Sequence, residues 1–281
     1  MNKIVYISDF FVSDIIGGGE LNDHELLSLL QQDNYSIFKK RSNELDLDFI
    51  KKNINAYYII SNFIRLGQEQ LNFIKQKCRY SIYEHDHKYM KTRNPAFYED
   101  LICSKEDLIN VEFYKKAERI FCQSSFHKNI INSNLNLNNV VNLSGNLWSL
   151  DSLEYLRELA KIEKQEKCSI LYSSTPHKNT SGAIFYCNKK DYQYELVESK
   201  NYKEFLSLLG NNKTFVFFPE TPETLSRVVV EARMMNMSVI SNKNIGAVHE
   251  PWFEFKGEKL IDFMLNKRKE ISDIVKEAIN E

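Results

Sequence analysis

The chain has 281 residues, of which 43% are hydrophobic and 27% are charged. This balance is typical of a globular protein and excludes a wholly disordered chain. The 37 basic and 38 acidic residues leave a formal net charge of -1. A protein that holds DNA mainly through its phosphates usually carries a basic excess, so we expect no nucleic-acid partner. The length is sufficient for two modest domains.

The cysteine pattern and the hydropathy indicate a cytoplasmic protein with reduced thiols. The five cysteines are scattered, and no two of them have the C-x-x-C spacing of a zinc site or a redox motif. Residues 1–10 contain an apolar run that Asp9 interrupts, without the cleavage pattern of a signal peptide. No apolar stretch of the sequence is long enough to span a bilayer. We therefore expect any membrane contact to be peripheral.

Strand and helix patterns alternate through the first half of the chain. A β-branched and aromatic run at 3–8 predicts a buried strand, and a glycine turn at 17–19 leads into a helical apolar pattern over 20–30. Further strands are predicted at 56–60, 79–83, 119–122 and 140–143, and further helices at 67–77, at 105–116 and from 126 onward. Repeated alternation of this kind indicates a mainly parallel sheet with helices on both faces.

A second alternating series fills the rest of the chain. It begins with a charged amphipathic pattern over 151–167, which predicts a helix, and we place a domain boundary just before it. Strands are then predicted at 169–173, 195–197, 214–218 and 238–241, with a helix over about 224–235 and one or two helices within 258–280. The expected fold class is α/β, with two Rossmann-like domains, residues 1–149 and 150–281, that face each other across a cleft. Ligands of such sheets bind at the carboxyl ends of the strands.

Residues 218–232 form the most informative segment of the sequence. A strand enters a turn that contains two prolines, and a helix is predicted to start immediately afterwards. Thr224 is the expected N-cap, which would turn free backbone N–H groups and the positive end of the helix dipole toward the cleft. Such a helix start suits a diphosphate.

Two glutamates, Glu223 and Glu231, bracket the start of this predicted helix, with seven residues between them. If the helix includes both, they lie ~12 Å apart along its axis, so the two carboxylates could reach opposite ends of an extended ligand. Carboxylates accept hydrogen bonds from sugar and ribose hydroxyl groups. The alternative interpretation places Glu223 in a capping turn and Glu231 on a solvated helix face.

The segment resembles the signature of retaining glycosyltransferases with the GT-B fold, especially family 4. Members of that family carry a glutamate, seven residues and a second glutamate at the start of the same strand–turn–helix. The flanking sequence is also similar, with Pro219 before the motif, an apolar run over 228–230 and a strand over 239–242. Gly246 then lies where the family has a glycine-containing turn.

The resemblance implies roles for residues of the second domain. Glu231 would bind the ribose hydroxyls of a donor nucleotide, and Glu223 would lie near the transferred sugar. Lys178, on the loop after the first strand of this domain, would bind the diphosphate and stabilise the charge that develops on the leaving phosphate. The remaining predicted donor-binding residues lie between the two glutamates and are Thr224, Leu225 and Ser226. A solvated surface lysine is the alternative for Lys178.

The resemblance also extends to the first domain. Gly18 and Gly19 resemble the glycine turn that faces the cleft in the family, where a missing side chain allows a backbone to come close to a ligand. His85, followed by Asp86 at the end of a strand, resembles a His-Asp pair whose histidine contacts the donor sugar or the acceptor. A core or capping histidine is the alternative. Glu223, His85 and Lys178 form the predicted catalytic set.

The sequence departs from the family pattern in several places. The arginine expected a few residues before Lys178 is absent, and Arg227 and Arg233 are candidates to replace it. Leu225 and Ser226 stand where the family has an aromatic–glycine pair. Little chain lies between Lys178 and the glutamate motif, so the second domain is expected to be shortened.

These features together predict retaining transfer of a sugar from a UDP- or GDP-linked donor to a glycan, lipid-linked or protein acceptor. We expect no cofactor and no metal, because the carboxylates lack the clustering that holds a hard cation. Two alternatives are a sugar-nucleotide epimerase and a catalytically degenerate binding or scaffold subunit. A dinucleotide-dependent oxidoreductase is disfavoured, because the glycines at 17–19 lack the G-x-G-x-x-G register. The sequence determines neither the donor, the acceptor nor the oligomeric state.

Overall fold

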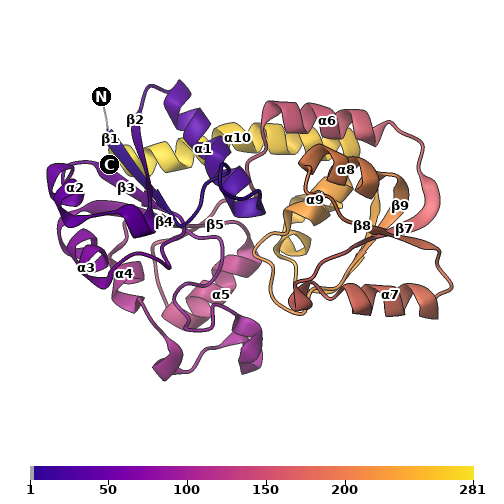
Figure 1. Ribbon diagram of the computed structural model, residues 1–281, viewed down its shortest axis with the longest axis horizontal. Helices are drawn as coiled ribbons and strands as arrows, with labels where there is room; N and C mark the ends of the chain where they lie inside the picture. The colour runs from indigo at the N-terminus through magenta and orange to yellow at the C-terminus, as the bar shows by residue number, and fades with distance from the viewer. Residues whose placement is uncertain (1–2) are drawn as a thin grey trace. The chain divides into compact units, whose positions relative to one another are not determined.

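The computed structural model describes residues 3–281, which form two compact units (Figure 1). The first unit comprises the residues up to Leu147 together with Arg268–Glu281, and the second comprises Trp148–Lys267. Both units are α/β with wholly parallel sheets, which confirms the predicted fold class.

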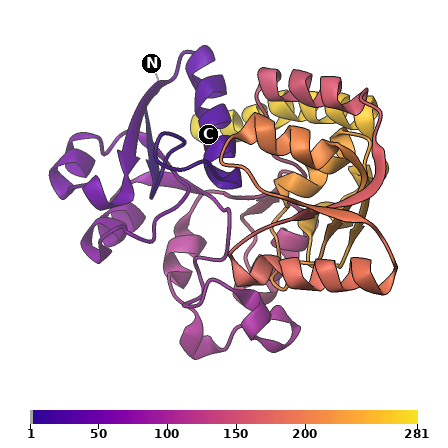
Figure 2. The ribbon, with the colours of Figure 1, turned by 45° about the vertical axis from the view of Figure 1, so that its right-hand side comes forward.

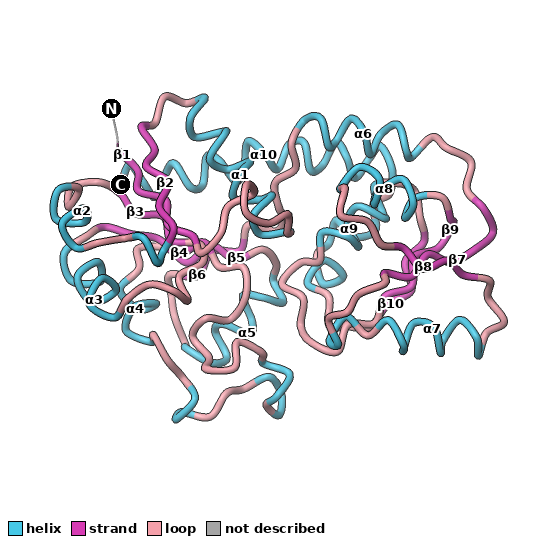
Figure 3. The backbone as a smooth tube through the Cα atoms, viewed as in Figure 1, coloured by secondary structure: helices cyan, strands magenta, loops and turns pink. Residues whose placement is uncertain are grey.

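The first unit is built on a six-stranded parallel sheet with the order β2-β1-β3-β4-β5-β6 (Figure 3). Its strands are β1 (Lys3–Ser8), β2 (Ser36–Arg41), β3 (Tyr57–Ile60), β4 (Arg79–Tyr83), β5 (Ile120–Cys122) and β6 (Val140–Asn142). Its helices are α1 (Gly18–Gln32), α2 (Leu47–Lys52), α3 (Gln68–Lys77), α4 (Val111–Lys116) and α5 (Ser125–Leu135). Short 3-10 turns lie at Ser42–Glu44, Pro95–Phe97, Glu99–Leu101 and Lys105–Asp107.

Alternate side chains of β1 fill two separate cores, one on each face of this sheet. Val5 and Ile7 belong to a cluster that includes residues of α2, α3 and α4. Ile4 and Tyr6 point to the opposite face and pack with Leu26 of α1. All four strand residues are fully buried, as expected when both faces of a parallel sheet are covered.

The second unit is a four-stranded parallel sheet with the order β10-β9-β7-β8. Its strands are β7 (Gln165–Leu171), β8 (Tyr194–Val197), β9 (Asn212–Phe217) and β10 (Ser238–Ser241). Its helices are α6 (Leu150–Ala160), α7 (Thr180–Lys189), α8 (Tyr202–Gly210) and α9 (Arg227–Met234), with 3-10 turns at Pro176–Lys178, Gly246–His249 and Pro251–Glu254. Helix α7 covers one face of the sheet, and α6, α8 and α9 cover the other (Figure 2).

Helix α10 (Gly257–Asn280) is a single helix, and its last part belongs to the first unit. Ile271, Val275 and Ile279 lie at helical spacing and pack in the same cluster as Ile4 of β1. The predicted domain range 150–281 therefore differs from the structure at its end, because this apolar stripe completes the core of the first unit rather than that of the second.

Two predicted helices are shorter than their sequence patterns suggested. The helix expected over 151–167 ends at Ala160, and β7 begins at Gln165, which pairs with Asn212 of β9. The helix expected over 105–116 is interrupted where Leu108 bridges to Met90 and Asn110 adopts a left-handed φ of 55°. In both cases pairing with residues distant in the sequence overrides a local helical pattern.

Four elements were not predicted: β2, α2, α7 and α8. Strand β2 is an edge strand with the sequence SIFKKR, whose side chains are partly or fully exposed, so it lacks the apolar alternation of a half-buried strand. Among residues 3–281, no helix combines the length and the hydropathy that crossing a membrane requires.

Candidate functional site

The loops that follow β7 and β9 bring two predicted site residues of the second unit together. Lys178 ends the 3-10 turn after β7, and Glu223 lies in the turn after β9. The Lys178 Nζ donates to Glu223 Oε1 at 2.7 Å, with side-chain exposures of 29% and 16%. Because carboxyl ends of neighbouring parallel strands meet at one sheet edge, residues far apart in the sequence become a partly exposed ion pair.

Asparagine side chains hold these loops in place. Asn179 adopts a left-handed φ of 57°, caps α7 by accepting from the Gly182 N–H at 3.0 Å, and donates to the Phe218 carbonyl at 2.9 Å. Asn244 donates to the Pro219 carbonyl at 3.1 Å from the loop after β10. These contacts fix the chain on both sides of the Lys178–Glu223 pair, and sequence patterns alone did not point to either asparagine.

The Glu223 backbone is tied to the loop after β10. Its N–H donates to the Asn244 carbonyl at 2.8 Å, and its carbonyl accepts from the Gly246 N–H at 2.9 Å. Leu225 is held similarly, since its carbonyl accepts from the Ala247 N–H at 3.0 Å and its side chain is fully buried. Leu225 as a whole is 0% exposed, so its predicted contact with a donor finds no support in this structure.

Helix α9 starts later than predicted. Its N-cap is Ser226, with φ 71° and ψ 84°, and its first residue is Arg227, so the expectation that Thr224 caps the helix is wrong. The reason is that the chain from Glu223 to Leu225 pairs with the loop after β10 instead of winding into a helical turn. The Ser226 Oγ is buried and has no hydrogen-bond partner among the described residues. A buried hydroxyl without a protein partner needs a water molecule or a ligand atom to complete its hydrogen bonding.

Ser226 is also a strained position, which yields a stability prediction. A left-handed conformation costs a non-glycine residue about 1–2 kcal/mol, partly offset by the larger unfolded-state entropy of glycine. We expect Ser226→Gly to raise the free energy of unfolding by about 0.5–1 kcal/mol in a urea titration. Ser149→Gly is a matched control, because Ser149 caps α6 at a φ of -65°. The control should lose a few tenths of a kcal/mol, and an equal loss in both variants would contradict the strain at Ser226.

Glu231 lies on α9 as a buried residue, with 2% exposure. Its Oε1 accepts hydrogen bonds from Trp148 Nε1 at 2.9 Å and from the Tyr202 hydroxyl at 2.7 Å. Arg227 Nε lies 3.5 Å from the same oxygen, and its guanidinium stacks 4.3 Å above the Trp148 ring. Burial and the Glu231 charge raise the pKa of Tyr202. Glu231 is thus the centre of a polar cluster in the core, rather than the solvated helix residue that was the alternative from the sequence.

The two arginines considered as replacements for the missing phosphate ligand have other partners. Arg227 lies against Glu231 and Trp148, with its side chain only 9% exposed. Arg233 Nη2 donates to the carbonyls of Phe253 and Glu254 at 2.8 and 2.9 Å, and burial lowers its pKa. Lys178, whose ammonium is partly exposed beside Glu223, therefore stays the predicted phosphate ligand.

In the first unit, His85 follows β4 and is held through both ring nitrogens. Its Nε2 lies 2.6 Å from Asp23 Oδ1, and its Nδ1 lies 2.7 Å from Gln123 Nε2. A Gln123 amide that donates to Nδ1 leaves Nε2 as the proton donor to Asp23. Ser61 Oγ donates to the other oxygen of Asp23 at 2.5 Å. Burial lowers the pKa of His85, but the Asp23 carboxylate outweighs it and holds that pKa above its usual value.

The glycine turn packs directly on this histidine. Helix α1 begins at Gly18, and a Cβ atom placed on Gly19 would lie 3.4 Å from the His85 Cγ. Gly19 thus lies against the His85 ring, whereas the predicted approach of this glycine turn to a ligand stays a prediction. Asp23 lies one helical turn after Gly19, and Gln123 follows β5. Both are polar residues at the carboxyl edge of the sheet, which is the signal that could have identified them.

The structure brings some of the predicted site residues together within each unit, whereas Glu231 lies in a separate polar cluster. Gly18, Gly19 and His85 lie together in the first unit, and Lys178 and Glu223 lie together in the second. Among residues 3–281, no three His, Cys, Asp or Glu side chains are grouped so that they could hold a metal ion. The roles assigned to these residues, and the expectation of neither metal nor cofactor, stay predictions.

Comparisons with known proteins find similar solved structures but no match by sequence. No protein-family model matches the chain, and a search of curated proteins gives no significant match. The catalytic domain of starch synthase IV from Arabidopsis thaliana, bound to ADP and acarbose, has a TM-score of 0.59 at 9% identity, covering 96% of this chain and 92% of that one. Anabaena HepE in complex with UDP and glucose has a TM-score of 0.51 at 13% identity, covering 99% and 92%.

A third similar structure is an α-glucosyltransferase in complex with UDP and a 13-mer DNA that contains a central A:G mismatch. Its TM-score is 0.51 at 11% identity, covering 97% of this chain and 90% of that one. At such identities the likeness shows the fold, which is the GT-B fold of nucleotide-sugar glycosyltransferases. Because a protein with this fold is in complex with DNA, the expectation of no nucleic-acid partner rests on net charge alone.

Proposed function

We propose that the chain is a glycosyltransferase that moves a sugar from a UDP- or GDP-linked donor to a glycan, lipid-linked or protein acceptor, with retention of the anomeric configuration. The observation that carries the proposal is the Lys178–Glu223 pair, which lies on the loops at the carboxyl ends of β7 and β9. A cation and a carboxylate at this edge provide a partner for a diphosphate and a partner for sugar hydroxyls.

Lys178 acts on the leaving group in this mechanism. As the bond between the anomeric carbon and the phosphate oxygen breaks, negative charge grows on the diphosphate, and an ammonium placed beside it stabilises that charge in the transition state. The unpartnered Ser226 hydroxyl at the start of α9 supplies a neutral donor, and the helix dipole adds to the attraction. The acceptor oxygen attacks the face from which the phosphate leaves, and the phosphate takes the acceptor proton.

His85 is the predicted catalytic residue of the first unit, and its contacts within that unit limit how it could bind a substrate. Its ring nitrogens are occupied by Asp23 and Gln123, so a sugar or acceptor hydroxyl that binds His85 has to replace Gln123 at Nδ1 or pack against the ring. We propose that His85 orients the sugar and does not abstract a proton, because Nδ1, the nitrogen that could take up a proton, lies 2.7 Å from the Gln123 amide.

The experiment that tests the proposal is a calorimetric titration of the folded protein with UDP, GDP and UDP-glucose. We expect one nucleotide to bind and Lys178→Ala to weaken that binding about 10- to 100-fold, since a hydrogen bond to a charged group contributes about 1.5–3 kcal/mol. Lys213→Ala is the matched control: Lys213 is an exposed lysine of the same unit, paired with Glu166 on the neighbouring strand β7. Equal affinities of the two variants would contradict the role of Lys178.

One observation favours a second candidate, a catalytically degenerate binding or scaffold subunit. Glu231, expected to bind ribose, already accepts hydrogen bonds from Trp148 and Tyr202 in the core. If the folded wild-type protein binds neither UDP nor GDP, this candidate replaces the transferase.

A further inference from the structure

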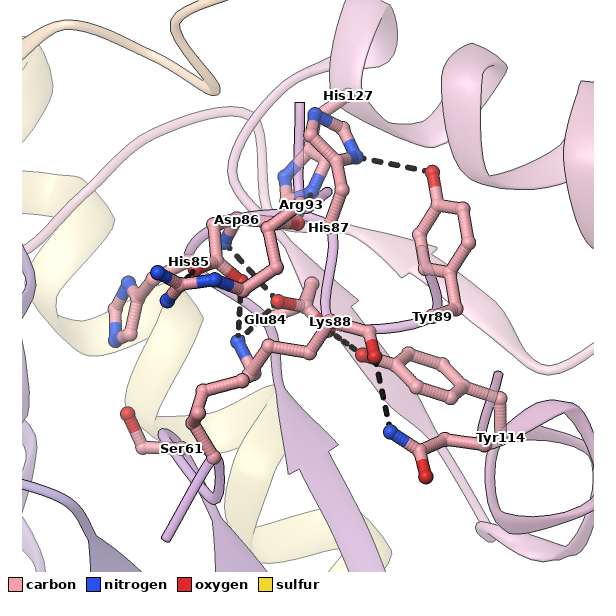
Figure 4. Close-up of polar contacts among 12 residues, drawn as sticks. Ser61, Glu84, His85, Asp86, His87, Lys88, Tyr89, Arg93, Tyr114 and His127 are labelled. Atoms are coloured by element: carbon pink, nitrogen blue, oxygen red, sulfur yellow. Dashed lines mark hydrogen bonds and ion pairs between the residues drawn. The ribbon is translucent and has the colours of Figure 1, made fainter. Parts of the chain in front are cut away.

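A buried ion pair lies in the loop that follows β4, beside His85 (Figure 4). Lys88 and Glu84 are both fully buried, and the Lys88 ammonium contacts the Glu84 carboxylate and also Asp86 Oδ1, the latter at 2.9 Å. Tyr114 of α4 donates to the second oxygen of Glu84. Removal of two charges from water costs several kcal/mol per ion, and an apolar pair of similar volume is often as stable. Stability alone therefore does not account for this cluster.

The arrangement fixes the backbone on both sides of His85. Glu84 and Asp86 are its immediate neighbours in the sequence, and both bind the same ammonium group. The Asp86 N–H donates to Glu84 Oε1 at 3.0 Å, which closes the loop further. The Lys88 carbonyl accepts from Asn110 Nδ2 at 3.0 Å, so the far end of the loop is also tied to the fold.

The same cluster connects the interior to the surface. The Asp86 side chain is 34% exposed, and its second oxygen lies 3.5 Å from the exposed Arg93 guanidinium. Figure 4 shows Asp86 between Lys88 on one side and Arg93 on the other, with His85 next to it. A displacement of Lys88 would therefore shift the loop that follows β4 and carries His85.

We propose that Lys88 is a positioning residue of the transferase site, which holds Glu84 and Asp86 so that the His85 ring packs on Gly19 and donates to Asp23. Its effect on turnover rests on the proposed function, whereas the placement of the ring is a property of the first unit alone. One measurement therefore tests the placement of the His85 ring, and a second tests its effect on turnover.

The variant that tests the role is Glu84→Gln with Lys88→Met. The glutamine oxygen keeps an acceptor for the Asp86 N–H, and its amide group then faces the Tyr114 hydroxyl, which can accept a hydrogen bond instead of donating one. The methionine fills the volume of the lysine stem, and Asp86, which is 34% exposed, keeps Arg93 as its cationic partner. The matched control is Glu112→Gln with Lys115→Met, which removes an exposed ion pair of α4 in the same unit. Lys88→Met alone replaces the double variant if the latter does not fold, because burial already raises the pKa of Glu84 and the carboxyl can stay protonated without its lysine partner.

The first readout is the nuclear Overhauser effect between the His85 ring protons and the Gly19 α-protons. The second is the release of UDP from UDP-glucose, analysed for kcat and KM. We expect the double variant to lose at least about half of the Overhauser intensity and to lower kcat about 10- to 100-fold with KM unchanged, as a misplaced group does. The control should match wild type in both.

An unchanged Overhauser effect in the folded variant would overturn the proposal, because Lys88 would then not position the ring. A lost effect with an unchanged kcat would overturn it as well, because the positioning would have no consequence for turnover. If wild type itself binds no nucleotide and releases no UDP, the proposed function fails, and the Overhauser effect still decides whether Lys88 places His85.

Discussion

Replacement of Glu231 by alanine should lower the free energy of unfolding by about 3–5 kcal/mol. The carboxylate accepts from Trp148 and Tyr202 and lies beside Arg227, and it is 2% exposed. Without it, an indole N–H and a phenol hydroxyl lose their acceptor, a guanidinium loses its counter-charge, and a small cavity forms. Urea denaturation followed by circular dichroism measures the loss.

Two further variants separate the charge from the hydrogen bonds. Glu231→Gln keeps an acceptor for both donors, so a smaller loss of about 1–2 kcal/mol is expected. Glu223→Ala removes the other glutamate of the motif, whose ion pair with Lys178 is partly exposed, and should cost less than about 1 kcal/mol. We therefore expect Glu231 to stabilise the core and Glu223 to contribute little to stability and more to ligand binding.

The opposite outcome would be informative about the donor site. If Glu231→Ala keeps wild-type stability but loses affinity for UDP or GDP, the carboxylate binds ribose as the family resemblance implies. Nucleotide binding would then replace its hydrogen bonds with Trp148 and Tyr202. Stability and nucleotide affinity should thus be measured on the same preparation.

We also expect acid to lower the free energy of unfolding strongly. His87 and His127 are buried with their rings 5.1 Å apart, and each has one ring nitrogen without a partner among the described residues, His87 Nε2 and His127 Nδ1. Burial, with Lys88 nearby, lowers the pKa of His87 to about 4, against a contrary effect of Asp86. Burial and then His87 lower the pKa of His127. Both rings are therefore neutral in the folded protein at pH values where the unfolded chain is protonated.

The difference between the folded and unfolded pKa values of these histidines decides how the free energy of unfolding changes with pH. A group with a depressed folded pKa contributes stability above its unfolded pKa and loses it as pH falls toward the folded value. For His87 the interval runs from 6.5 to about 4 and corresponds to about 3 kcal/mol. Glu84 acts in the opposite direction, because burial raises its pKa to about 7 and its contribution falls as pH rises from 4.5. A variant without His87 is therefore needed to separate its contribution to the pH dependence from that of Glu84.

His87→Gln is that variant. Its free energy of unfolding should fall by about 3 kcal/mol less than that of wild type between pH 7 and pH 4, in urea titrations at each pH. His24→Gln, which changes an exposed histidine of α1, should follow wild type throughout. Parallel curves for wild type and His87→Gln would show that the buried ring does not contribute to acid sensitivity.

The strands could be predicted from the sequence because they depend on local patterns, whereas Lys178 and Glu223 were assigned to one site through the family resemblance. Continuous β-branched and aromatic runs such as Ile4–Ile7 identify strands buried on both faces. Once strands alternate with helices, the parallel sheet follows, and the loops after neighbouring strands must meet at one edge. The proximity of Gly19 to His85 follows from the same rule.

Other features depend on contacts that no local pattern records. The start of α9 at Arg227 is decided by pairing between Glu223 and the loop after β10, and the last residues of α10 are assigned by the core they fill in the first unit. A helical apolar stripe shows that a face will be buried, but not against which sheet.

The environments of the charged residues were decided only by the tertiary structure. From the sequence, Glu231 was a ribose ligand or a solvated glutamate, and Lys88 had no assigned role. The structure encloses both: Trp148 and Tyr202 bind the first, and Glu84 and Asp86 bind the second. A charge can be buried only where the fold brings its partners to it, and those partners are set by packing between elements that sequence periodicity does not relate.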